Sequence, residues 1–181
     1  MAKELYILRH CKTLFNKKNI ISGQMDCPLI NYDIDYYVLS EKDPSSLYVL
    51  ISSPLSRCLL TGKILQEQSQ LQISYHIDSR IIERNMGMLE GKNRNDLIQK
   101  YPDYFNNGHF KSYITPPMGE SYHAFQSRIA SFVPDIENLL LEHNVIVCAH
   151  NQSLRMFTSI IAGKSYTDIP QYPNGKVIRI F

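Results

Sequence analysis

Short apolar runs that alternate with segments of helical periodicity constrain the fold of this chain most strongly. The runs at 5–8, 48–51 and 145–149 are apolar at every position, which is typical of strands buried on both faces in a parallel sheet. A polar cluster follows the first run and a helical pattern follows each of the other two, and this alternation of strands with helices predicts an α/β fold. We expect a three-layer αβα sandwich, with a mostly parallel central sheet and helices on both faces. Further strands are expected at 73–77 and 177–181, and helices at 55–65, 93–101, 121–140 and 153–161.

The chain length favours a single domain over residues 1–181, because 181 residues suffice for one well-buried core and are few for two. Pro134 should kink or split the long helical pattern at 121–140. The segment 102–119 holds three prolines and two glycines. We interpret it as a long surface loop that caps the substrate.

Composition excludes several classes of function. A net charge of +2 without a long basic run argues against nucleic-acid binding. No apolar stretch is long enough to span a membrane, and the opening of the chain does not resemble a signal peptide. The four cysteines form no C-x2-C pair, so neither a zinc site nor a disulfide framework is expected. We therefore expect a cytoplasmic protein without a metal or cofactor.

Polar clusters stand where the predicted strands end. Arg9-His10 follows the first strand, 52–57 follows the second, and His150-Asn151-Gln152 follows the run at 145–149. Glu83 lies just beyond the weaker strand at 73–77. Ligands of open parallel sheets bind at the carboxyl ends of the strands, so these clusters should meet there.

The residues in these clusters suit phosphoryl transfer through a covalent intermediate. A neutral imidazole can attack phosphorus and divide one difficult displacement into two easier ones. Guanidinium groups and a second histidine can bind the phosphoryl oxygens. A carboxylic acid can protonate the leaving alkoxide and then accept a proton from water. Two arginines would supply the charge that a metal ion supplies in other phosphatases.

Six segments, taken in order, resemble the histidine phosphatase superfamily, which includes the cofactor-dependent phosphoglycerate mutases. RHCKTLFN at 9–16 is similar to the family signature Arg-His-Gly-x-Thr-x-x-Asn. The other segments are SGQMDCPL at 22–29, SSPLSRCLLT at 52–61, IIERNMGMLEG at 81–91, PPMGES at 116–121 and VIVCAHNQSLR at 145–155. The resemblance spans nearly the whole chain.

The resemblance implies a role for each matching residue. His10 would be the phosphorylated nucleophile and Glu83 the proton donor. Arg9, Arg57 and His150 would form the phosphate pocket. The predicted substrate-binding residues are Asn16, Ser22, Gly23, Arg84, Asn151 and Gln152, the last two through backbone N–H groups near a helix start.

Two positions depart from the family pattern. Cys11 and Asn151 stand where the family usually has glycine. If either position requires a positive φ, the side chain there costs about 1–2 kcal/mol.

The resemblance implies a phosphomonoesterase of the histidine acid phosphatase type that acts on a small phosphorylated metabolite without a metal. The main alternative is a phosphoglycerate mutase, although family mutases are typically longer and carry an insertion that caps the site. A weakly active member that binds phosphorylated ligands is a second alternative. Lys92, Arg94 and Lys111 form, with Arg84, either a basic rim or ordinary solvated charges, and the other histidines, including His109, are interpreted as surface residues. The sequence identifies neither the substrate nor the oligomeric state.

Overall fold

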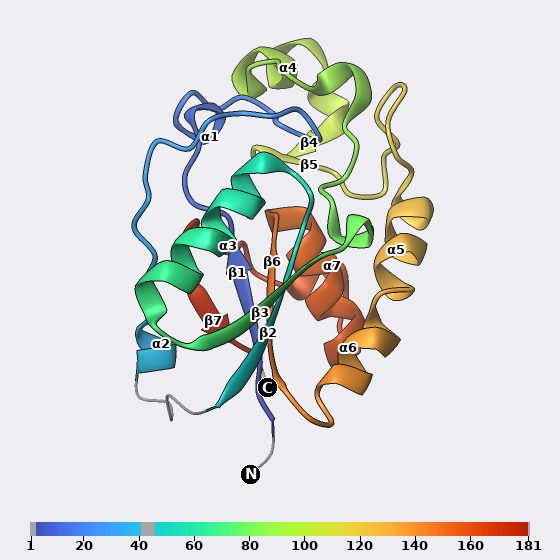
Figure 1. Ribbon diagram of the computed structural model, residues 1–181. Coiled ribbons are helices and arrows are strands. Elements are labelled where there is room, and N and C mark those ends of the chain that lie inside the picture. Colours follow the sequence, from blue (N-terminus) through green and yellow to red (C-terminus); the bar gives the residue numbers. More distant parts are fainter. Residues whose placement is uncertain (1–2, 41–45, 181) are drawn as a thin grey trace.

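The computed structural model describes residues 3–40 and 46–180, and its centre is a five-stranded sheet (Figure 1). The strand order is β3 (Gln72–Ile77), β2 (Leu47–Ser52), β6 (Asn144–Ala149), β1 (Leu5–Arg9) and β7 (Val177–Arg179). The first four are parallel, and β7 pairs antiparallel with β1. The predicted fold class is confirmed, and the weak strand at 73–77 is an edge strand.

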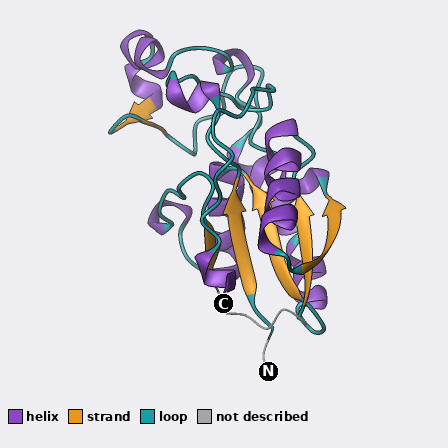
Figure 2. Ribbon diagram, turned by 60° about the vertical axis from the view of Figure 1, so that its left-hand side comes forward, coloured by secondary structure: helices purple, strands orange, loops and turns teal. Residues whose placement is uncertain are grey.

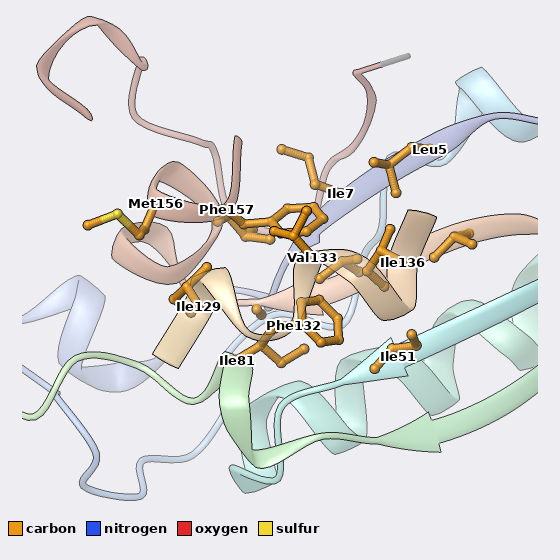
Figure 3. Close-up of a cluster of buried hydrophobic side chains, with 14 of the residues drawn as sticks. Leu5, Ile7, Ile51, Ile81, Ile129, Phe132, Val133, Ile136, Met156 and Phe157 are labelled. Carbon is orange, nitrogen blue, oxygen red and sulfur yellow. The ribbon is translucent and has the colours of Figure 1, made fainter. Parts of the chain in front are cut away.

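Helices cover both faces of the sheet because neighbouring residues of each strand point to opposite faces. On one face, Tyr6 and Leu8 of β1 pack with residues of α3 (Ser56–Ser69) and α2 (Tyr37–Ser40). On the other, Leu5 and Ile7 pack with α5 (Tyr122–Ala130), α6 (Val133–Leu139) and α7 (Asn151–Ala162). Figure 3 shows this second core, in which Phe132 and Phe157 lie against each other at 5.6 Å between ring centroids.

The predicted helix at 121–140 is split into α5 and α6, as Pro134 indicated. Pro134 is the second residue of α6, where its missing N–H would have no helical partner in any case. Ser121 caps the start of α5 by accepting from the backbone N–H of Ala124 at 3.1 Å.

Beyond the carboxyl ends of the strands, a separate group of short elements forms a cap (Figures 1 and 2). The prediction of an unstructured loop at 102–119 is wrong for its first part. A 3₁₀ turn, η3 (Pro102–Tyr104), leads into a small hairpin of β4 (Phe105–Asn106) and β5 (His109–Phe110). Its turn is Asn107-Gly108, both with positive φ, which is the preferred sequence for a two-residue hairpin.

The cap has a small hydrophobic cluster of its own, to which Ile21, Met86, Leu97 and Phe105 contribute. Leu97 belongs to α4 (Arg94–Lys100), the short helix expected at 93–101. The remaining short elements are α1 (Leu14–Lys17), η1 (Ser79–Ile81), η2 (Gly87–Leu89) and η4 (Tyr166–Asp168).

None of the helices within 3–40 and 46–180 has the length and apolar character that a membrane span requires.

Candidate active site

A cavity of about 310 Å³ lies between the carboxyl ends of the strands and the cap. It brings together residues from β1, the 16–23 segment, α3, the segment after β3, and the start of α7. Nine of the eleven predicted site residues line it: Arg9, His10, Asn16, Ser22, Gly23, Arg57, Glu83, Asn151 and Gln152. The two that do not are His150 and Arg84.

His10 is buried at the end of β1 with one ring nitrogen held by the backbone. Its Nδ1 lies 2.8 Å from the carbonyl oxygen of Cys11, to which it donates in the neutral tautomer. Nε2 then carries the lone pair. Burial lowers the pKa of His10 well below 6.5, and the positive charges of Arg57 and Arg9 lower it further. His10 is therefore a neutral imidazole at pH 7, which is the form that can attack phosphorus.

The backbone fixes the position of His10 as well. The backbone N–H of His10 donates to the Ala149 carbonyl of β6 at 3.1 Å. The backbone carbonyl of His10 accepts from the side-chain amide of Asn174 at 2.8 Å. Asn174 carried no sequence signal, because it stands far along the chain in an irregular segment.

Arg9 and Arg57 place two positive charges beside His10. Arg57 is 1% exposed and donates through Nη1 and Nη2 to the carbonyl oxygens of Met25 and Gly23, at 2.7 and 2.8 Å. Arg9 donates through Nη1 to the carbonyl of Tyr172 at 2.7 Å, whereas its buried Nε has no hydrogen-bond partner among the described residues. Among the described residues neither arginine forms an ion pair with a carboxylate within 4.0 Å.

His150 lies beside His10, with ring centroids 5.3 Å apart, but behind the cavity wall. Its Nε2 is 2.7 Å from the Ser53 hydroxyl, and its Nδ1 accepts from Nε of Arg57 at 3.2 Å. Burial lowers the pKa of His150 well below 6.5, and the charge of Arg57 adds to this effect. In this arrangement His150 orients Arg57, and its predicted direct contact with phosphate stays a prediction.

The Glu83 carboxylate is bound at the start of α7. Oε2 accepts from the backbone N–H of Gln152 at 3.3 Å. Oε1 accepts from the backbone N–H groups of Arg84 and Ser153 at 3.0 and 3.2 Å, and from the Ser153 hydroxyl at 3.1 Å. The helix start thus binds a carboxylate, so the expectation that the Gln152 N–H binds the substrate anion does not match the structure.

Asn16 and Gly23 line the cavity from the 16–23 segment. The Asn16 Oδ1 accepts from the backbone N–H and hydroxyl of Thr13, at 3.1 and 3.0 Å, within the capping box of α1. This leaves its Nδ2 to donate into the cavity. Gly23 has φ +48°, and a Cβ there would lie 2.0 Å from a Glu90 carboxylate oxygen, so another residue would strain the backbone and displace the Glu90 side chain.

Arg84 lies outside the cavity, contrary to its predicted role in substrate binding. Its guanidinium is buried and donates to the carbonyl oxygens of Ser112, Ile114 and Glu120, at 2.8, 2.8 and 3.0 Å. It holds the second half of the 102–119 segment in place.

The two departures from family glycines carry no backbone strain, because neither Cys11 nor Asn151 has a positive φ. Cys11 is fully buried, and its N–H donates to the Thr61 hydroxyl at 2.9 Å. The side-chain amide of Asn151 donates to Gln171, and its oxygen accepts from the backbone N–H of Tyr172 at 3.0 Å.

Several residues that line the cavity were missed or left undecided by sequence reasoning, and three of them have polar side chains close to the predicted site. His109, interpreted as a surface residue, lines the cavity from the cap, and Gln171 lines it from the segment after η4. Arg94, which the sequence left open as either part of a basic rim or a solvated charge, also lines the cavity, whereas Lys92 does not. The only sequence signal for Arg94 is its own positive charge and its place near the segments that resemble the family.

The sequence pattern of the histidine phosphatase superfamily (branch 1) matches residues 5–180. The chain belongs to this superfamily. Two solved structures share the fold of this family member. The mycobacterial glucosyl-3-phosphoglycerate phosphatase superposes with a TM-score of 0.77 at 18% identity, covering 98% of this chain and 90% of that one. The α-ribazole phosphatase of Shigella flexneri gives 0.74 at 20% identity, again covering 98% and 90%.

The relatives in sequence include both isomerases and phosphatases. A 2,3-bisphosphoglycerate-dependent phosphoglycerate mutase of Chlamydia felis is 29% identical, covering 95% of this chain and 90% of the mutase. That match extends over 205 positions, more than the 181 residues of this chain, so the mutase carries insertions. A candidate phosphoserine phosphatase of Hydrogenobacter thermophilus is 26% identical over 164 positions, covering 89% and 79%.

Proposed function

We propose that this chain is a phosphomonoester hydrolase that acts through a phosphohistidine at His10 on a small phosphorylated metabolite. The observation that carries the proposal is a pair of arginine charges that no ion pair among the described residues neutralises. Arg9 and Arg57 flank a neutral histidine, have no carboxylate ion pair among the described residues, and leave the Arg9 Nε without an acceptor. A bound phosphoryl group would supply the missing negative charge and acceptor.

In the first step, Nε2 of His10 attacks phosphorus. A bond forms between nitrogen and phosphorus while the bond from phosphorus to the ester oxygen breaks. Glu83 in its protonated form gives its proton to the leaving oxygen, so an alcohol departs. Arg9 and Arg57 stabilise the negative charge on the phosphoryl oxygens, which is the role that bound metal ions take elsewhere.

In the second step, water replaces the alcohol. Its oxygen attacks phosphorus, the bond to Nε2 of His10 breaks, and Glu83 takes up the proton. The products are inorganic phosphate and the enzyme with His10 neutral and Glu83 protonated. Both residues line the same cavity, as this scheme requires.

A phosphoglycerate mutase is the second candidate, because several relatives in sequence are mutases and the same phosphohistidine would serve them. The insertions in the Chlamydia felis mutase favour hydrolysis here, since this shorter chain has less material with which to exclude water from the phosphoenzyme.

The test is hydrolysis of 4-nitrophenyl phosphate in the presence of a chelator. We expect turnover in the wild type, an acid-labile and base-stable phosphoenzyme on rapid quenching, and neither of these in His10→Ala. Folding of the variant is checked by circular dichroism. Interconversion of 3- and 2-phosphoglycerate that depends on a bisphosphoglycerate primer, without comparable hydrolysis, would instead identify a mutase.

A further inference from the structure

Asn151 is the first residue of α7 and stands where the family usually has glycine. Both ends of its side-chain amide are engaged. Oδ1 accepts from the backbone N–H of Tyr172 at 3.0 Å, and Nδ2 donates to the side-chain oxygen of Gln171. A glycine could form neither bond, so both contacts depend on the departure from the family pattern.

The segment just before β7, which Asn151 contacts, also holds the end of β1. The Tyr172 carbonyl accepts from Nη1 of Arg9 at 2.7 Å. The Asn174 side chain donates to the backbone carbonyl of His10 at 2.8 Å, and the Gly175 N–H donates to the backbone carbonyl of Arg9 at 2.9 Å. The segment therefore contacts both residues that β1 contributes to the phosphate pocket.

The two arginines of the pocket are held to different degrees. Among the described residues, the bond to Tyr172 is the only hydrogen bond of the Arg9 side chain. Arg57 makes three, two to backbone carbonyls and one to the ring of His150. The orientation of the Arg9 guanidinium thus depends on where the Tyr172 carbonyl lies.

Tyr172 is fixed to α7 at two points. Its ring hydroxyl donates to the hydroxyl of Thr158 at 3.0 Å, which holds the side chain. The bond from Asn151 holds the backbone N–H. Only the two dihedral angles of Tyr172 lie between its N–H and its carbonyl, so fixing the N–H restricts where the carbonyl can point.

We propose that Asn151 is a positioning residue that orients the Arg9 guanidinium toward the phosphoryl group through the backbone of Tyr172. The inference rests on the proposed function, in which Arg9 binds the phosphoryl oxygens. The Nε of Arg9, which has no hydrogen-bond partner among the described residues, is the donor that this arrangement presents to the substrate. The Asn151 side chain thereby acts on the anion pocket without binding the anion.

Asn151→Ala and Asn151→Gly test the role, because both remove the side chain and keep the backbone N–H that is predicted to bind substrate. Neither is strained, since Asn151 does not have a positive φ. Inorganic phosphate is titrated by calorimetry, and kcat/KM is measured with 4-nitrophenyl phosphate. We expect both variants to bind phosphate about five- to tenfold more weakly and to lose a similar factor in kcat/KM, the value of one hydrogen bond. Asn138→Ala, at an exposed position on α6 outside the cavity, is the matched control.

A double-mutant cycle with Arg9→Met separates positioning from a general effect on the fold. If Asn151 acts through Arg9, Asn151→Ala should cost less than about twofold in kcat/KM once the guanidinium is absent. A residue that only stabilised the fold would cost the same factor in both backgrounds. Urea unfolding shows that each protein compared is folded under the assay conditions.

The outcomes separate this inference from the proposed function. An equal loss in both backgrounds, or wild-type phosphate affinity in Asn151→Ala and Asn151→Gly, would overturn the positioning role and leave the hydrolase intact. Phosphate binding does not require turnover. A wild type that binds phosphate and hydrolyses no ester would therefore overturn the proposed function, and the phosphate titrations would still decide the role of Asn151.

Discussion

The two walls of the active site are built in different ways. On the strand side, His10 and Arg57 are buried and Arg9 is half-buried, and backbone carbonyls hold all three side chains. On the cap side, His109 and Gln171 are exposed and belong to irregular segments or a two-residue strand. The strand wall is a preformed anion pocket of fixed side chains. The cap wall consists of exposed side chains on short segments.

This difference suggests a division of labour. A pocket fixed by the sheet can serve any phosphate ester, because the phosphoryl group is the same in all of them. A wall of short segments can change without disturbing the core, so specificity for the rest of the substrate should reside there. Variants of the strand wall should therefore affect every substrate alike, and variants of the cap wall should affect substrates selectively.

Glu83, which the start of α7 holds in the same cavity, also acts on the phosphoryl group, so apart from loss of His10 the largest effect is expected for Glu83→Gln. The amide can neither give a proton to the leaving group nor accept one from water, so steady-state turnover should fall by about 10²–10⁴-fold. A nitrophenolate leaving group needs no proton, so a burst of about one equivalent of product should precede the slow phase.

Stopped-flow absorbance of nitrophenolate measures that burst. Glu137→Gln, an exposed position on α6, is the control and should behave as the wild type. A Glu83→Gln enzyme with unchanged turnover would show that another group moves the proton.

A smaller loss is expected for Arg9→Met. Removing one buried donor to the phosphoryl group should reduce kcat/KM by about 10²–10³-fold for long and short esters alike. The pKa of His10 should rise toward its usual value, because the charge of Arg9 now lowers it. The acid limb of the kcat/KM profile should therefore move to higher pH.

The profile is measured with two esters of different length. Arg80→Met, whose ion pairs with Asp78 and Asp135 lie outside the cavity, is the control. A loss confined to one ester would contradict the division between the two walls.

The strand wall was also the part that the sequence could predict. Arg9, His10 and Arg57 directly follow or soon follow apolar strands, and parallel strands must end at one edge of the sheet. The position of His150 beside His10 follows from the same rule. Its partners do not, because the contact with Ser53 depends on side-chain packing that spacing does not encode.

The cap wall could not be derived in the same way. The strands of the hairpin at 105–110 are too short for the alternation of apolar and polar residues to appear. Asn107-Gly108 is a turn signal, but the count of prolines and glycines in the segment did not distinguish a hairpin from a loop. Arg84 was predicted to bind substrate as part of a basic rim, yet its guanidinium donates to carbonyl oxygens that lie 28 to 36 residues away along the chain. Such contacts depend on how the loop folds back, which is a property of the tertiary structure.

Acid sensitivity offers the finest test of the strand wall. His10 and His150 are neutral in the folded protein, with pKa values well below 6.5, whereas in the unfolded chain they take up protons as the pH falls through that value. The unfolded state then binds more protons, so stability falls with decreasing pH by up to about 1.4 kcal/mol per unit for each histidine. The lowered pKa values of Asp35 and Asp78 act only below 3.8.

Urea unfolding at pH 7.5, 6.5 and 5.5 measures this slope. His109→Asn, which removes an exposed ring from the cap wall and no buried one, is the control and should keep the wild-type slope. Saturating phosphate should raise the midpoint at each pH, because it binds only the folded state. Stability that does not change between pH 7.5 and 5.5 would mean that the two histidines are not buried as neutral rings, and the strand wall would then lack its nucleophile in the reactive form.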